Sequence, residues 1–148
     1  MKQTTGISAH MVNQSLAGAR AKGLDIERLL RKSNIKPEQL NVSGAHISIE
    51  HYVMLRRYTV GAMKDEVTGF YPRGEPMGFF RATTLGAIHA PNIGEAMQRM
   101  LELRNVYENG LKSQIEIRGN QAHFSLKRLP VQTRLASFAI EHAMLINH

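Results

Sequence analysis

The sequence predicts an α+β fold, a mainly helical domain with a late antiparallel β-hairpin covered by helices. Helix-start signals and apolar residues spaced three and four apart recur along most of the chain up to Gly110. The clear alternation of apolar and polar residues comes after that point, on both sides of a two-residue Gly-Asn turn. A length of 148 residues with 43% apolar and 21% charged residues is typical of one soluble domain.

The first helix is expected from Ser8 onward, because a serine hydroxyl can cap a helix start. Val12, Leu16 and Ala19 then recur at helical spacing, and Gly23 supplies the left-handed conformation that favours a helix end. We therefore expect one continuous helix between the serine and this glycine.

Two further helices are predicted before the middle of the chain. Asp25 is the expected N-cap of the first, in which Leu29 and Leu30 form an apolar stripe. A longer helix follows over residues 48–63, and Arg56 lies on its inward-facing side.

The middle of the chain predicts a connector followed by a helix in the core. Residues 69–76 are interrupted by glycine and proline and favour an irregular segment. Residues 77–90 carry Arg81 as their one fixed charge and are too few to span a membrane. We interpret them as a central buried helix lying beneath the hairpin.

A strong helix start follows at Asn92, whose side chain can cap while Glu95 reaches back toward the cap residue. Met97 lies on this helix, and Asn109-Gly110 ends it.

The hairpin is predicted over residues 114–118 and 121–127, joined by Gly119-Asn120. With Arg118 opposite Gln121, apolar residues share one face and polar residues the other. The expected pairs are Ile117 with Ala122, Ile115 with Phe124, Ser113 with Leu126, Gln114 with Ser125 and Glu116 with His123.

A last helix is expected from Val131 to the end of the sequence, after Pro130 breaks the strand. The helical pattern continues up to His148 without a cap. We therefore expect residues 1–148 to be one domain that is truncated at its C-terminal end.

The charge balance leaves several partners open. The 19 Lys and Arg exceed the 12 Asp and Glu, giving a formal charge of +7, which suits nucleic acid, an anionic ligand or an acidic protein surface. The basic residues form no long run and no ladder with aromatic residues, so most are expected on solvated helix faces.

Motifs for catalysis or metal binding do not stand out. His46 and His51 are five apart, which turns their rings away from each other on a helix, whereas zinc ligands are usually three or four apart. The sequence holds no Gly-x-Ser-x-Gly elbow, no phosphate-binding glycine loop and no cysteine. We therefore expect no enzyme activity, no cofactor and no metal.

A ligand pocket is the functional hypothesis that the residues themselves suggest. Methionine and phenylalanine can line a deformable pocket, although ordinary core packing is the alternative explanation. A fixed charge in a buried helix needs a partner or an anionic ligand. The candidate effector contacts are Arg56, Arg81 and His89 for polar groups, with Phe80 and Met97 as apolar lining.

Four segments occur in a characteristic order: residues 23–40 (GLDIERLLRKSNIKPEQL), 47–50 (ISIE), 77–80 (MGFF) and 90–96 (APNIGEA). In this order and spacing they resemble the N-terminal effector domain of AraC-type bacterial transcription regulators, in the arabinose-binding-domain branch. The resemblance covers the chain from about Leu16 onward.

The resemblance implies a regulatory domain that senses a ligand and forms a homodimer. From the residues themselves we expect a cytoplasmic, non-enzymatic domain whose pocket binds a small, anionic or amphipathic effector. In that family promoter DNA is bound by a C-terminal pair of helix-turn-helix units, to which nothing in this sequence corresponds. A pure dimerisation module without effector, and direct contact of the basic surface with nucleic acid, remain the alternatives. No membrane partner is expected.

Overall fold

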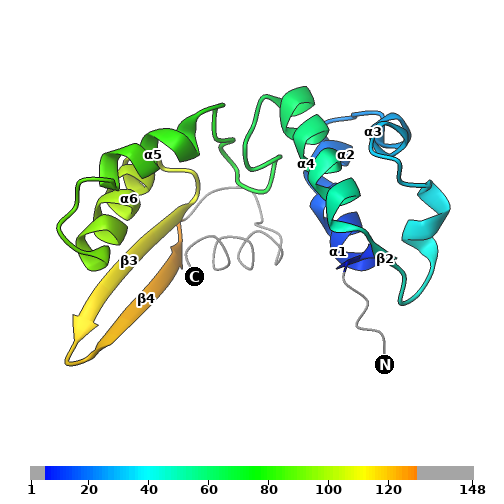
Figure 1. Ribbon diagram of the computed structural model, residues 1–148. Coiled ribbons are helices and arrows are strands. Elements are labelled where there is room, and N and C mark those ends of the chain that lie inside the picture. Colours follow the sequence, from blue (N-terminus) through cyan, green and yellow to red (C-terminus); the bar gives the residue numbers. More distant parts are fainter. Residues whose placement is uncertain (1–5, 130–148) are drawn as a thin grey trace.

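A computed structural model describes residues 6–129 of the chain. These residues form two lobes joined by a connector, residues 64–78, that contains no helix or strand (Figure 1). The helix expected from Val131 onward lies outside the described residues. Within these residues the architecture is α+β, with six α-helices and a late antiparallel hairpin packed against helices, and the predicted fold class is confirmed.

The first lobe is built from helices and one short pair of strands. Its elements are β1 (Ile7–Ser8), α1 (Ala9–Ser15), α2 (Ala17–Ala21), α3 (Ile26–Lys32), the 3-10 helix η1 (Pro37–Asn41), β2 (His46–Ile47) and α4 (Ile49–Met63). The strands β1 and β2 pair antiparallel. Their two-residue length leaves no alternation that the sequence could reveal.

The helix starts of this lobe are capped where the sequence predicts. The Ser8 hydroxyl accepts a bond from the Met11 amide at 3.2 Å, and Asp25 Oδ1 accepts from the Arg28 amide at 2.8 Å. The first helix is nevertheless divided at Leu16, which ends α1 and begins α2. The division places Leu16 in the core at 1% exposure while α2 turns Gly18 against the connector.

The core of the first lobe is formed by aliphatic side chains from every helix between α1 and α4 except α2. It consists of Ala9, Val12, Leu16, Leu29, Leu30, Ile35, Leu40, Ile47 and Leu55. A second, smaller core lies at the connector. There Val67, Phe70 and Tyr71 pack with Leu111 of the hairpin and with Met11 of α1, so the connector contacts both lobes.

The second lobe contains α5 (Phe79–Ala87), α6 (Ile93–Tyr107), β3 (Leu111–Arg118) and β4 (Gln121–Arg128). The order of packing is α5 on α6 and α6 on β3 (Figure 1). The hairpin has the predicted register, from Arg118 opposite Gln121 to Ser113 opposite Leu126, and continues to Leu111 opposite Arg128.

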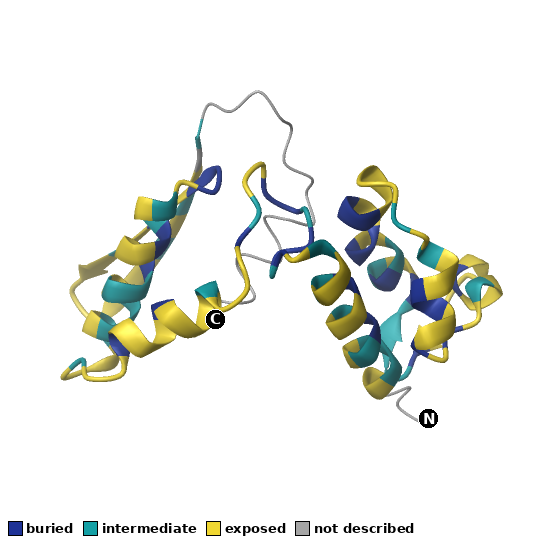
Figure 2. Ribbon diagram, turned by 90° about the horizontal axis from the view of Figure 1, so that it is seen from above, coloured by how far each residue is buried: buried dark blue, intermediate teal, exposed yellow. Residues whose placement is uncertain are grey.

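The prediction of a central buried helix over residues 77–90 is wrong. The helix is shorter, Phe79–Ala87, and buries Thr83 and Ala87 while most of its surface is exposed (Figure 2). The exposed fractions of Leu85 and Ile88 are 53% and 64%. The reason is that α6, and not α5, covers the hairpin, so α5 has a neighbour on one side only among the described residues.

In the described part of the chain, no helix is long and apolar enough to cross a membrane.

Candidate ligand-binding site

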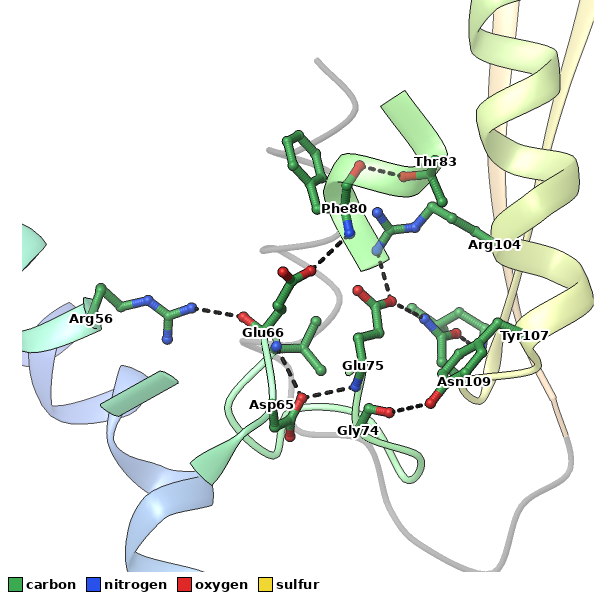
Figure 3. A network of polar contacts seen from close by, with 12 residues as sticks. Arg56, Asp65, Glu66, Gly74, Glu75, Phe80, Thr83, Arg104, Tyr107 and Asn109 are labelled. Atoms are coloured by element: carbon green, nitrogen blue, oxygen red, sulfur yellow. Dashed lines mark hydrogen bonds and ion pairs between the residues drawn. The ribbon is translucent and has the colours of Figure 1, made fainter. Parts of the chain in front are cut away.

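A hollow of about 460 Å³ lies where the two lobes meet the connector. We call it the inter-lobe hollow. It is lined by Arg56 and Val60 of α4, Glu66, Val67 and Glu75 of the connector, Phe80 of α5 and Arg104 of α6. Figure 3 shows its polar side chains converging from these elements.

A buried ion pair lies at one side of the hollow. Arg104 donates from Nη2 to Glu75 Oε1 at 3.0 Å, and both side chains are at least nine-tenths buried. Asn109 Nδ2 donates to the same carboxylate oxygen at 2.7 Å (Figure 3). Burial raises the pKa of Glu75, and although Arg104 and Asn109 act in the opposite direction, burial has the larger effect.

Tyr71 of the connector is buried beside this pair. Burial raises the pKa of its hydroxyl to about 12, while the nearby Arg104 acts to lower it. The phenol therefore stays neutral at physiological pH.

The connector is held in shape by Asp65, whose side chain is buried. Its Oδ1 accepts bonds from the amides of Val67 at 3.1 Å and Glu75 at 2.9 Å, and its Oδ2 accepts from Gly69 at 2.8 Å. The ammonium group of Lys22 lies 3.8 Å from Oδ2. One carboxylate thus fixes the two ends of the connector loop against each other.

Glu66, the next residue, fixes the start of α5. Its two carboxylate oxygens accept bonds from the amides of Gly78 at 2.6 Å and Phe80 at 2.8 Å. These amides lie at the N-terminus of α5, where a negative charge is stabilising. The contact sets the position of Phe80 at the edge of the hollow (Figure 3).

Arg56 is the cation of the hollow that has no carboxylate partner. It donates to the Thr68 hydroxyl at 2.6 Å and to the Glu66 carbonyl oxygen at 3.4 Å, and its guanidinium lies 5.8 Å from the Phe70 ring centre. Within the described residues it makes no ion pair. Burial lowers the pKa of Arg56, a shift that Tyr52 and Asp65 counteract.

A comparison with known families identifies the chain. Residues 23–148 match the family described as the arabinose-binding domain of AraC transcription regulators, at their N-terminal end. The chain belongs to this family. The resemblance predicted from the four sequence segments is therefore confirmed. No curated protein and no solved structure matches.

The structure of this AraC-type domain brings together two of the five predicted effector contacts. Arg56 and Phe80 line the inter-lobe hollow. Arg81 and His89 are both exposed and do not line it. Met97 is half-buried on α6 and does not line the hollow either. Arg81 was expected to need a buried partner or an anionic ligand because its helix was expected to be buried. Since α5 is mostly exposed, this argument no longer applies to Arg81.

Sequence reasoning missed Glu66, Glu75 and Arg104. Glu75 lies in the segment 69–76 that was interpreted only as a connector, and Glu66 lies between that segment and the helix predicted over residues 48–63. Arg104 lies 29 residues from Glu75. The one usable signal was Arg104 itself, which follows Leu101 at a three-residue spacing on the buried side of α6.

Among the described residues, no group of three or more His, Asp or Glu side chains could hold a metal ion.

Proposed function

We propose that this domain senses a small amphipathic anion bound in the inter-lobe hollow. The observation that supports this proposal is Arg56, a half-buried guanidinium whose hydrogen bonds to residues 6–129 all go to uncharged oxygen atoms. A carboxylate there would gain a charge-assisted, bidentate hydrogen bond. The apolar part of the ligand would contact Val60, Val67 and Phe80.

Sensing requires that the ligand distinguishes two arrangements of the protein. The hollow is lined by α4 of the first lobe, by the connector and by α5 and α6 of the second lobe. A ligand that contacts all of them binds best at one relative position of the lobes, and so favours that position.

The proposed role is binding without catalysis. The carboxylates around the hollow already have partners, since Glu75 pairs with Arg104 and Glu66 holds the start of α5. Neither is poised as a general base. We assign promoter recognition to another part of the regulator, and we place the regulator in the cytoplasm, where promoter DNA is.

The experiment is a thermal-shift measurement with octanoate, decanoate and L-arabinose, the last because the family description names that sugar. A ligand at roughly 100 times its dissociation constant stabilises by about 2.7 kcal/mol. We expect the carboxylates to raise the melting temperature, and Arg56→Met and Phe80→Ala to abolish the rise. Arg81→Ala is the matched control and should retain it.

A ligand whose stabilisation survives both Arg56→Met and Phe80→Ala binds elsewhere, which contradicts the proposal. Stabilisation by arabinose alone would retain a sensing role but reject the anionic ligand.

We further propose that the domain forms a homodimer through the exposed apolar side of α5 and α6. Ile88 and Ile93 line one open groove there, with exposed fractions of 64% and 78%. Such neighbouring exposed aliphatic residues are typical of an interaction surface.

Sedimentation velocity tests the dimer. Ile93→Glu should convert it to a monomer, whereas Val42→Glu, at a 58% exposed position of the first lobe, should not. Equal sedimentation of the wild type and Ile93→Glu would contradict this interface.

A further inference from the structure

A second concave surface lies on the first lobe, between α3 and α4. This α3–α4 groove has a volume of about 470 Å³ and shares no lining residue with the inter-lobe hollow. It is lined by Leu24, Asp25, Arg28, Leu29, Lys32, Arg57, Tyr58, Gly61 and Ala62.

Basic side chains line both sides of the groove. Arg28 and Lys32 lie four residues apart on α3, and Arg57 lies on α4. Like charges at this helical spacing cost stability, so helix formation does not explain them. The Lys32 ammonium lies 5.7 Å from the Tyr58 ring centre.

These cations lack the counter-ions that other basic residues have. Within the described part of the chain, the side chains of Arg28 and Arg57 have no hydrogen-bond or ion-pair partner. Arg31, on the same helix but outside the groove, pairs with Glu27 at 3.1 Å. The carboxylate of Asp25 lies in the groove, but it caps α3 through the Arg28 amide.

The floor of the groove is apolar and spacious. Leu24, Leu29 and Ala62 contribute aliphatic surface. A Cβ atom built at Gly61 would meet nothing within 4 Å, so the last turn of α4 leaves room for an incoming side chain.

We propose that the α3–α4 groove binds an acidic amphipathic helix of another protein. Such a helix would place apolar residues on the floor, carboxylates against the basic sides, and its remaining polar face in solvent. A nucleic acid would meet the cations but would gain nothing from the aliphatic floor. A second copy of this chain carries the same +7 charge and lacks complementarity.

The probe is a fluorescein-labelled synthetic helix with leucines at positions i, i+3, i+4 and i+7 and glutamates on both flanks of that stripe. Its binding to the 148-residue chain is followed by fluorescence anisotropy. A peptide of the same composition with scrambled order is the control. We expect saturable binding of the patterned peptide alone, weakened by salt because the contacts are ionic.

Charge reversal separates the groove from the overall charge. Arg28→Glu combined with Arg57→Glu should weaken binding about tenfold or more. Arg99→Glu combined with Arg118→Glu changes the net charge equally outside the groove and should leave binding unchanged. The groove double variant should in turn bind a peptide with lysine in place of glutamate, which a merely unfolded variant would not do.

Gly61→Met should block binding by filling the floor while leaving the fold intact, as judged by circular dichroism. Equal binding of both peptides, equal loss in the two double variants, or displacement of the peptide by duplex DNA would each overturn the proposal. None of these variants changes a residue that lines the inter-lobe hollow. The thermal-shift response to the proposed effector can therefore be measured independently of peptide binding.

Discussion

Glu75 and Arg104 form the most deeply buried ion pair among the described residues, with side-chain exposures of 2% and 9%. Removing two charges from water is costly, and the attraction between them offsets this cost only while both are present. The pair joins the connector to α6. Its loss would therefore weaken the contact between the connector and the second lobe.

Arg104→Met should therefore lower the free energy of unfolding by about 3–5 kcal/mol, because it leaves the Glu75 carboxylate buried without its cation. Urea denaturation measures this change. Arg31→Met removes an exposed ion pair with Glu27 and should cost less than about 0.5 kcal/mol. Equal effects of the two substitutions would show that burial of the pair is unimportant.

The raised pKa of Glu75 predicts how stability changes with pH. An unfolded glutamate titrates near 4.5, and the folded value is higher, so the folded protein binds more protons between the two values. Stability contributed by this group is therefore present in acid and is lost as the pH rises through the folded pKa.

We expect the stability of the wild type relative to Glu75→Gln to fall as the pH rises from about 4 toward neutrality. Measuring both proteins by denaturation at each pH cancels the contributions of other groups. A difference that stays constant over this range would contradict the prediction.

Two glycines in the helices of the first lobe have opposite structural roles. A Cβ atom at Gly18 of α2 would overlap the Thr68 carbonyl oxygen of the connector, whereas a Cβ atom at Gly61 of α4 would meet nothing within 4 Å. The first glycine permits close packing between α2 and the connector. The second leaves open space beside α4, in the α3–α4 groove, and lowers the stability of its helix.

Gly18→Ala should lower the free energy of unfolding by about 1–3 kcal/mol, since the connector must move away from α2. Gly61→Ala should raise it by up to about 1 kcal/mol through helix propensity alone. Chemical denaturation of the two variants gives both signs. A stabilising Gly18→Ala would mean that the connector does not rest on α2.

At the scale of elements, the features that depend on neighbouring residues were predictable. The register of β3 and β4 follows from the two-residue turn at Gly119-Asn120 and from alternation. The caps at Asp25 and Asn92 follow from side chains that reach amides three residues away.

Features that depend on which helix packs against the hairpin were not predictable from the sequence. The apolar composition of α5 indicated burial, but α6 occupies the position on the hairpin. Arg56 and Phe80, which line the hollow, each carry a signal that is visible in the sequence, a charge on an apolar helix side and a large aromatic side chain. Glu75 and Arg104 were missed because their significance lies in a contact between residues 29 positions apart.

At the scale of the whole molecule, the connector determines how the two lobes are placed. Asp65 binds amides at both ends of the connector loop, and Val67, Phe70 and Tyr71 form a core with side chains from both lobes. Asp65→Ala should therefore loosen the relative position of the lobes while each lobe stays folded.

Pulsed electron paramagnetic resonance between spin labels at Glu27→Cys and Glu102→Cys measures this, and the chain has no native cysteine to interfere. We expect Asp65→Ala to broaden the distance distribution. Asp25→Ala removes a carboxylate that accepts an amide bond within one lobe and should leave it unchanged. Equal widths in all three proteins would show that the lobes are held by other contacts.

Asp65 and Glu66 are adjacent in the chain, yet their carboxylates accept hydrogen bonds from different segments. Asp65 binds amides of the connector loop, and Glu66 binds amides at the first turn of α5. A small rotation of the backbone between these two residues would therefore shift the first turn of α5 relative to the connector loop. Over its nine residues the helix is about 13 Å long, so a slight turn at its origin becomes a displacement of ångströms at its far end. The guanidinium of Arg56 donates a hydrogen bond to the carbonyl oxygen of Glu66. A ligand bound beside Arg56 would therefore change the position of α5 at the outer surface of the molecule.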